Sequence, residues 1–419
     1  MKTLSVLFAA AAAAAAPMIP AAAASVYEVR RQEETCPQDG AARALRQTVV
    51  IIDEAAVQAD PKANQRWVRA VVEAADAGEA SRGTLGPRER FAIFVARRDG
   101  SELVPLFAGC SPNIPDAEFK AEQAADTSWR TFVGTDAASR RKSARTAFSD
   151  GVAASLAQIH KQAAEIAASP APPGALLSAL RNVGALARSG EGAPRYVIVS
   201  PFQIGAKPEG GAIPAARAKG FALARASGVD FGRAEVYLVG AHLPAGAAQE
   251  FVRAFLLGAK AALAGVRSDG LPPLSDEPAS LRVFQGFIDY VGDRRPMQAR
   301  IAASSKGDLV NSWVEIAGVE AVATPLAGKL LCRKPDQCEL KGDGRFAMAW
   351  SDDPQKAPDD RGELPFGGAR NVALVISGDT AKGSVSDPIV VFQGEERDGR
   401  RPELKDLTFE ISRVDGSPF

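Results

Sequence analysis

The stretch that decides the fold is TVVII at residues 48–52, which runs directly into Asp53 and Glu54. A continuous, largely β-branched run of this length predicts a buried central strand of a parallel sheet. An acidic residue at the carboxyl end of such a strand often holds a ligand or a metal ion. Here Ala55 and Val57 follow, so the hydroxyl groups that help an aspartate to hold a divalent cation are absent. The stretch therefore predicts a binding fold that has lost its metal site.

Residues 48–266 alternate short apolar strands with helical stretches, the last of them a predicted helix over Ala247–Ala264. This alternation predicts an α/β, Rossmann-like sheet that is mostly parallel and covered on both faces. The predicted strands Phe91–Val95 and Glu102–Phe107 are joined by a short link that contains an Asp-Gly turn. Because a parallel crossover needs a dozen or more residues, this link makes a hairpin. We therefore expect one antiparallel edge strand.

The carboxy-terminal third of the chain has a different pattern of predicted elements. Residues 268–279 form a proline-rich break, and short β-like runs between turns follow over residues 280–419. These runs predict a compact antiparallel domain of the β-sandwich type, and the chain length also favours two domains. The predicted organisation is a signal peptide at 1–24, an α/β domain at 25–267, a linker at 268–279 and an all-β domain at 280–419.

The amino terminus has the features of an export signal. Lys2 precedes an apolar run over Leu4–Ala16, and a small-residue stretch ends at Ala24. This pattern predicts a signal peptide that is cleaved after Ala24. No later stretch is long and apolar enough to predict an integral membrane span. We expect the mature protein to be periplasmic or secreted.

The four cysteines are an even number in a chain that is predicted to be exported, which favours disulfide bonds. Cys332 and Cys338 flank a polar, turn-like segment, so a local bridge between them is the natural choice. That choice leaves Cys36 to pair with Cys110. The spacings do not match those of a zinc site.

Charge and motif content exclude several classes of partner. The chain has 50 basic and 50 acidic residues, so it offers no net attraction for nucleic acid. The adjacent glycines Gly210 and Gly211 lack the spacing of a phosphate-binding loop. We predict no nucleic-acid partner and no cofactor.

The order of the predicted elements resembles the von Willebrand factor A-like fold over roughly residues 36–266. The resemblance rests on a central strand that ends in Asp53, an edge hairpin, a long helical excursion and two further strand-helix units. In that family, an Asp-x-Ser-x-Ser loop, a distant threonine and a further aspartate hold a metal ion at the carboxyl ends of the strands. In this chain Asp53 matches, whereas Ala55 and Val57 occupy the two serine positions.

The other two metal-binding positions of that family also differ here. Ser200, followed by Pro201, ends the strand after which an acidic residue is common, and Ser169 or Ser178 would stand in for the threonine. The resemblance implies a degenerate domain with weak or no metal binding, for which Asp53 is the one candidate ligand. It also implies a non-catalytic interaction or scaffold role, with another protein as the partner. The binding crevice would include Asp53, Glu54, Ser200, Gln203 and His242.

Two alternative functions remain open at this point. The sheet order of the family would bring Ser200, His242 and Asp53 into one crevice, where they would form the triad of a periplasmic hydrolase. Against this, the nucleophile turn Gly-x-Ser-x-Gly is absent, and Pro201 lacks the amide that commonly serves an oxyanion. The second alternative is a weak cation-dependent adhesion module at Asp53. We therefore predict no catalytic residue.

Overall fold

The computed structural model describes residues 27–32, 36–37, 44–76, 85–126, 128–132, 135–165, 171–187, 192–204, 213–290, 293–316, 324–344, 370–386 and 406–414. The predicted signal peptide at 1–24 lies outside these residues, as do Ser169, Gly210 and Gly211.

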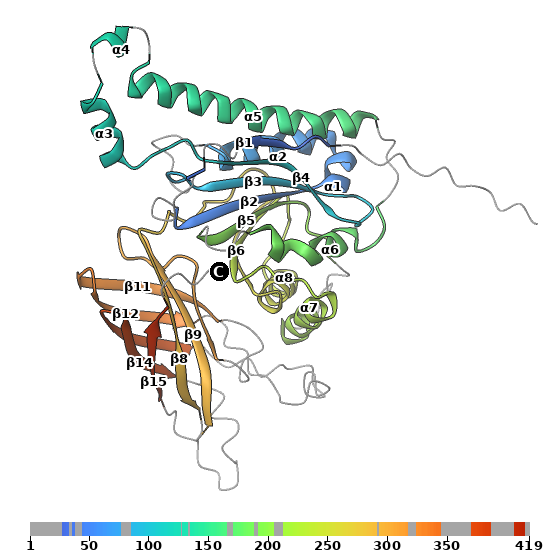
Figure 1. Cartoon of the computed structure of the whole chain (residues 1–419). Helices are drawn as coiled ribbons and strands as arrows, with labels where there is room; N and C mark the ends of the chain where they lie inside the picture. The colour runs from blue at the N-terminus through green and yellow to red at the C-terminus, as the bar shows by residue number, and fades with distance from the viewer. Residues whose placement is uncertain are drawn as a thin grey trace, which may run out of the picture.

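The amino-terminal part is an α/β unit built on a seven-stranded sheet in the order β1-β4-β3-β2-β5-β6-β7 (Figure 1). Strands β3, β2, β5, β6 and β7 are parallel, whereas β4 runs antiparallel to β3. The sheet is therefore mostly parallel with one antiparallel pair. Its strands are β1 (Arg30–Gln32), β2 (Arg46–Asp53), β3 (Arg90–Ala96), β4 (Leu103–Cys110), β5 (Ala193–Val199), β6 (Ala234–Val239) and β7 (Ala261–Arg267).

Helices cover both faces of this sheet (Figure 1). On β2, Val50 and Ile52 belong to a core with α1, α2 and α5, whereas Val49 and Ile51 belong to a core with α6, α7 and α8. Both faces of β2 are buried, which is why its sequence is a continuous apolar run. The helical elements are α1 (Glu54–Ala59), α2 (Pro61–Ala74), α3 (Asp116–Ala124), α4 (Ser128–Phe132), α5 (Ala137–Glu165), α6 (Ala175–Ala179), the 3-10 helix η3 (Leu180–Leu186), α7 (Ile213–Ser227) and α8 (Ala247–Gly258).

Two details of the α/β unit differ from expectation. The antiparallel strand β4 is not the edge of the sheet, because the three-residue strand β1 pairs with it in parallel. A segment so short and charged carries no strand signal. The predicted helix over Ala247–Ala264 ends at Gly258, and the remainder begins β7, which pairs with β6. Sheet pairing here overrides the helix propensity of an alanine-rich segment.

The carboxy-terminal part is all-β, as expected, but it is a closed antiparallel barrel of eight described strands rather than a sandwich. The strands follow the order β10-β11-β12-β13-β14-β15-β8-β9 (Figure 1). They are β8 (Ser280–Tyr290), β9 (Asp293–Ala303), β10 (Ser312–Ile316), β11 (Thr324–Lys334), β12 (Gln337–Gly344), β13 (Arg370–Ser377), β14 (Thr380–Ser386) and β15 (Asp406–Arg413).

The barrel closes where the last strand, β15, pairs with the first, β8. At this seam a Cβ on Gly286 would lie 2.9 Å from the carbonyl oxygen of Glu410, so glycine allows the close approach of the two strands. Inward-facing apolar side chains such as Phe284, Leu340 and Ile411 form one core inside the closed sheet. Closure of the sheet around this core leaves no edge of the described strands unpaired, and this is the physical advantage of a barrel over a sandwich.

Both disulfides join the pairs that the sequence favours. Cys36 is bonded to Cys110 at the end of β4, and Cys332 is bonded to Cys338 across the β11–β12 hairpin. The bonds are consistent with an extracellular or periplasmic protein. In the part of the chain that the structure describes, no helix has both the length and the apolar character needed to cross a membrane.

Candidate functional site

The carboxyl ends of β2 and β5 bring Asp53 and Ser200 together. The Ser200 hydroxyl donates a hydrogen bond to Asp53 Oδ2 at 2.7 Å, and Asp53 Oδ1 accepts a longer one, 3.4 Å, from the amide of Ala56. Asp53 is thus the N-cap of α1. Burial raises the pKa of Asp53, while the hydrogen bonds from Ser200 and the helix amides oppose that rise. The pair holds the start of α1 against the next strand.

The turn after β5 makes Ser200 a structural residue. Its side chain is completely buried, and its oxygen also accepts a hydrogen bond from the amide of Phe202 at 2.9 Å. Phe202 has a φ of 55°, an unusual value for a bulky residue. Its buried ring meets Phe255 edge to face with 6.1 Å between the centroids. The hydroxyl of Ser200 therefore stabilises a strained turn as well as the cap at Asp53.

Glu54, although acidic, is also committed to the structure. Its side chain is buried and accepts hydrogen bonds from the hydroxyl of Tyr27 at 2.6 Å and from the amide of Arg98 at 3.0 Å. These contacts tie the amino-terminal segment and the β3–β4 turn to α1. Glu54 is consequently not available to a partner in this conformation.

The remaining two predicted crevice residues, Gln203 and His242, are exposed. Beside them, Gly240 has a φ of 86° and lies against the indole of Trp67, where a Cβ would come within 2.7 Å of the ring. Trp67 itself is buried. The space at the carboxyl end of β6 is therefore filled by packed side chains. Gln203 and His242 lie at the surface there.

This geometry decides what chemistry the edge supports. The single hydroxyl proton of Ser200 goes to Asp53, so the serine does not donate to His242 as a hydrolytic triad requires. Both oxygens of Asp53 already accept hydrogen bonds, and the side chains of Ala55 and Val57 have no oxygen. Within the described residues, no three His, Cys, Asp or Glu side chains cluster in a way that suits a metal ion.

At the opposite ends of these strands, where the parallel strands begin, lies a buried charge cluster that the sequence did not reveal. Glu89 is fully buried just before β3 and accepts two hydrogen bonds from Arg46, to Oε1 at 3.0 Å and to Oε2 at 2.8 Å. It also accepts from the hydroxyl of Thr48 at 2.5 Å and from Arg195 at 3.4 Å. Burial alone would raise the pKa of Glu89, but the two arginines and these hydrogen bonds lower it to about 2.

This cluster anchors the segment that connects the two parts of the chain. The carbonyl of Ser275 accepts hydrogen bonds from Arg46 at 2.8 Å and from Arg195 at 3.4 Å. The amide of Ser275 donates to the hydroxyl of Tyr237 at 2.9 Å, and its hydroxyl donates to Glu235 at 2.7 Å. One residue is thus fixed to the starts of β2, β5 and β6.

The barrel meets the α/β unit beside this anchor. Asn311, just before β10, donates from its backbone amide to Glu235 at 2.8 Å and from its side chain to the carbonyl of Pro194 at 2.9 Å. Arg233 forms an ion pair with Glu315, and its guanidinium lies 4.5 Å from the ring centroid of Trp313. These contacts attach the barrel to the amino ends of the parallel strands, whereas Asp53 lies at their carboxyl ends.

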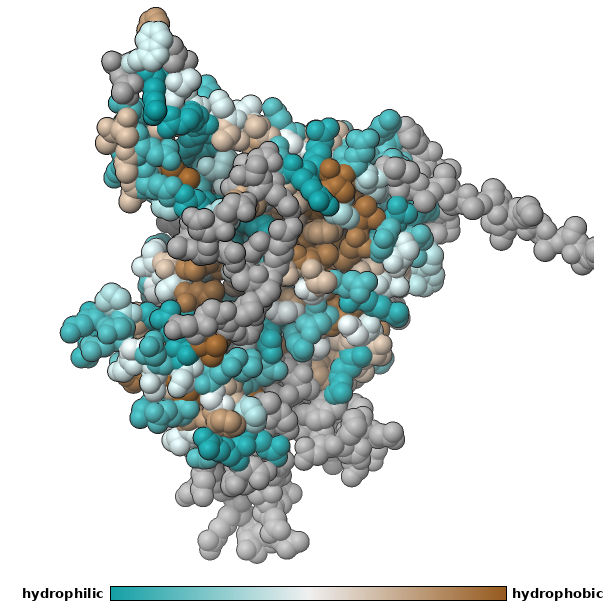
Figure 2. Space-filling model, in the orientation of Figure 1, coloured by the Kyte–Doolittle hydropathy of each residue, from teal (hydrophilic) through white to brown (hydrophobic). Residues whose placement is uncertain are grey.

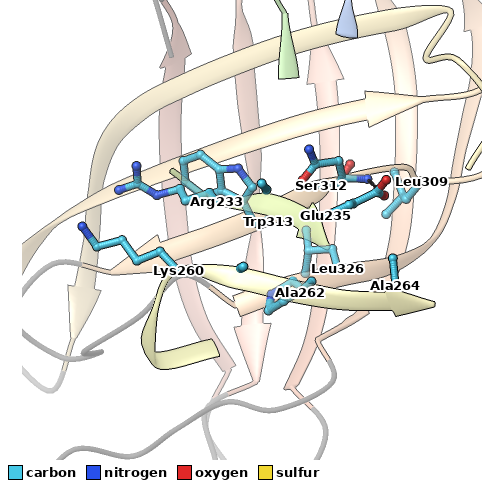
Figure 3. Close-up of a pocket in the computed structure, with 13 residues that line it drawn as sticks. Arg233, Glu235, Lys260, Ala262, Ala264, Leu309, Ser312, Trp313 and Leu326 are labelled. Carbon is cyan, nitrogen blue, oxygen red and sulfur yellow. Dashed lines mark hydrogen bonds between the residues drawn. The ribbon is translucent and has the colours of Figure 1, made fainter. Parts of the chain in front are cut away.

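A small pocket lies at this junction (Figure 3). Its volume is about 110 Å³, and Figure 3 shows the cationic side chains of Arg233 and Lys260 at one end and Leu309 and Ala264 at the other. Lys260 is paired with Asp230 at 2.7 Å. Ligand sites for drug-sized molecules are typically about 300–1,000 Å³. The pocket suits water or a small solute and has no room for a larger organic cofactor.

Glu277, in the same connecting segment, predicts a pH-dependent stability. Burial and the nearby charge of Glu89 raise its pKa to about 7, against the opposing effect of Arg46 and Arg195. The folded state then holds a proton that the unfolded state releases near pH 4.5, so stability falls as pH rises from about 4.5 to above 7. We expect Glu277→Gln to be more stable than the wild type by about 1–2 kcal/mol at pH 8, after allowance for partial exposure.

Chemical unfolding of both proteins at pH 5, 6, 7 and 8 measures this effect. The advantage of Glu277→Gln should disappear at pH 5, and the neighbouring Asp276→Asn serves as the matched control. An equal difference between Glu277→Gln and the wild type at every pH would show that Glu277 does not titrate in this way.

The signal that would have located the buried cluster is the charge at the start of each parallel strand. In the strand order β3, β2, β5, β6, the residues at the strand starts are Glu89, Arg46, Arg195 and Glu235, so two basic residues lie between two acidic ones. The register pairs Arg195 directly with Glu235. Opposite charges on adjacent strands stabilise the pairing. The pattern becomes visible only once the strand order is known.

Comparison with known proteins finds no matching family model and no matching curated protein.

Proposed function

We propose that the protein is an exported, non-catalytic protein-interaction or scaffold protein, whose α/β unit is a von Willebrand factor A-like domain with a degenerate, metal-free site. The observation that carries the proposal is the hydrogen bond from Ser200 to Asp53. It occupies the aspartate that would otherwise hold a cation, and it removes Ser200 from nucleophilic chemistry. The strand order, with β2 central between β3 and β5, also supports the resemblance.

The placement of the barrel supports a binding role for the opposite edge. Ser275 and Asn311 attach the barrel at the amino ends of the parallel strands. The carboxyl ends, with Gln203 and His242 exposed, lie at the other edge of the sheet. In open α/β sheets, ligands bind outside the carboxyl ends of the strands. The barrel therefore braces the sheet without covering the face where a partner would bind.

Calorimetry tests the metal-free part of this proposal. The mature chain is stripped with chelator and titrated with magnesium, manganese and calcium, beside an Asp53→Ala variant. We expect no saturable binding in either protein, because hydroxyl ligands are missing and Asp53 is already hydrogen-bonded. Saturable binding that Asp53→Ala abolishes would contradict the proposal and favour a cation-dependent adhesion module.

Site-specific crosslinking tests the interaction itself. A photo-reactive residue is placed at Gln203 or His242 in cells that export the protein, with Lys382 on the outside of the barrel as the matched control position. We expect the probes at Gln203 and His242 to form adducts with one and the same partner protein, and the probe at Lys382 to form none. Identical adducts from all three positions, or no adduct from any, would refute a specific contact at the strand ends.

A further inference from the structure

The short helix α4 presents two large aromatic side chains to solvent. Trp129 is 67% exposed and Phe132 is 82% exposed, the highest values among the large hydrophobic residues that the structure describes. Their rings stack on each other with 5.8 Å between centroids and an interplanar angle of 27°. The two side chains therefore form one apolar feature, and we call it the aromatic tip.

The aromatic tip lies on a projection formed by α3, α4 and the start of α5. This projection stands away from the sheet at the upper left of Figure 1 and forms the upper left corner of the molecule in Figure 2. Helix α3 packs on α5, and Arg141 lies 4.5 Å from the ring centroid of Phe119, which fixes the base of the projection. A convex apolar feature on a braced base reaches a flat surface without hindrance from the rest of the molecule.

The charge around the aromatic tip is positive, although the whole chain is neutral. Between Glu122 and Lys142 the sequence has four basic and three acidic residues, which gives a net charge of +1. Arg130 and Arg140 lie 3.9 and 3.6 Å from the carboxylate of Asp126, and Arg140 also lies 3.6 Å from that of Glu122. Lys142 is exposed. The carboxylates of Asp126 and Glu122 balance these two guanidinium groups. The small positive excess beside the aromatic rings therefore comes from Arg141 and Lys142 against Asp136.

We propose that the aromatic tip is a peripheral membrane contact, in which Trp129 and Phe132 enter the interface of an anionic lipid bilayer and the neighbouring basic residues face its headgroups. Tryptophan is favoured at this interface because its ring is apolar and its N–H stays hydrated. Basic side chains near an anionic surface add attraction that decays within the Debye length. Two rings and a small excess of charge give a weak, reversible contact.

Vesicle binding by the mature, full-length protein tests this proposal. Vesicles of phosphatidylcholine alone are compared with vesicles that also contain phosphatidylglycerol. We expect binding to the anionic vesicles, a blue shift of tryptophan emission, and loss of binding as salt is raised. Trp129→Ala and Phe132→Ala should each weaken the apparent affinity about tenfold, and Lys142→Glu should weaken it by a smaller factor.

The matched control is Phe287→Ala, which removes another exposed aromatic side chain, on the outside of the barrel. It should bind vesicles as the wild type does. The substitutions at the aromatic tip remove largely exposed side chains, and unchanged circular dichroism checks that they fold. No binding to anionic vesicles, or equal binding by the Trp129→Ala variant, would overturn the proposal. Self-association that the same variant abolishes, without any vesicle binding, would overturn it in favour of a protein contact.

Discussion

Replacing Glu89 with glutamine is expected to lower the free energy of unfolding by about 3–5 kcal/mol, because a broken buried ion pair leaves an uncompensated charge. Glu89 and Arg195 are fully buried, and Arg46, the other arginine that Glu89 neutralises, is buried as well. Glutamine keeps the shape but offers only one oxygen and no charge. The two guanidinium groups would then lose the one buried carboxylate that both of them contact.

The measurement is urea unfolding of the full chain, and Glu73→Gln is the matched control. Glu73 pairs with Arg69 on an exposed face of α2, so its loss should cost less than about 0.5 kcal/mol. A second variant, Glu89→Gln with Arg195→Met, removes one of the stranded cations and should recover part of the loss. Equal stability of Glu89→Gln and the wild type would mean that the cluster does not stabilise the sheet.

The part of the fold that was predictable from the sequence is the part with local, periodic signals. The apolar run before Asp53 identified a buried strand, and the Asp-Gly link identified the β3–β4 hairpin. The barrel was not predictable as a barrel, because its closure pairs β8 with β15 across more than 100 residues of chain. Strand signals give the class of a domain, whereas closure depends on which distant edges meet.

The candidate site shows the same division between local and distant information. The sequence identified Asp53 and Ser200 as residues at neighbouring strand ends, and the structure places them 2.7 Å apart. It did not reveal that Ser200 and Glu54 are buried, because Ser200 packs in the folded sheet against Asp53, and Glu54 against Tyr27, both from other segments of the chain. Residue type and strand position locate a site, but the direction of each hydrogen bond decides its chemistry.

The second large effect is expected at Arg300, which joins the barrel to the α/β unit. Arg300 is fully buried in β9 and donates to the carbonyl oxygen of Asn311 at 3.0 Å, to its side-chain oxygen at 2.6 Å, and to the carbonyl of Arg233. Its guanidinium also lies 5.3 Å from the ring centroid of Trp313. Burial lowers the pKa of Arg300 to about 9, which still leaves the side chain charged at neutral pH. It therefore acts as a charged donor to both sides of the junction.

We expect Arg300→Ala to lower the free energy of unfolding by about 3 kcal/mol, because it leaves three partly buried carbonyl-type oxygens without this donor and opens a cavity. Asn311 has a φ of 45° and would lose the contacts that hold this conformation, so the link to Glu235 should loosen. Calorimetry should then resolve separate unfolding of the barrel and the α/β unit, and protease should cut residues 268–279 faster. Arg294→Ala on the same strand, where the side chain is exposed, is the control and should change stability by less than about 0.5 kcal/mol. A single unfolding transition at the wild-type temperature in Arg300→Ala would show that the two parts are coupled by other contacts.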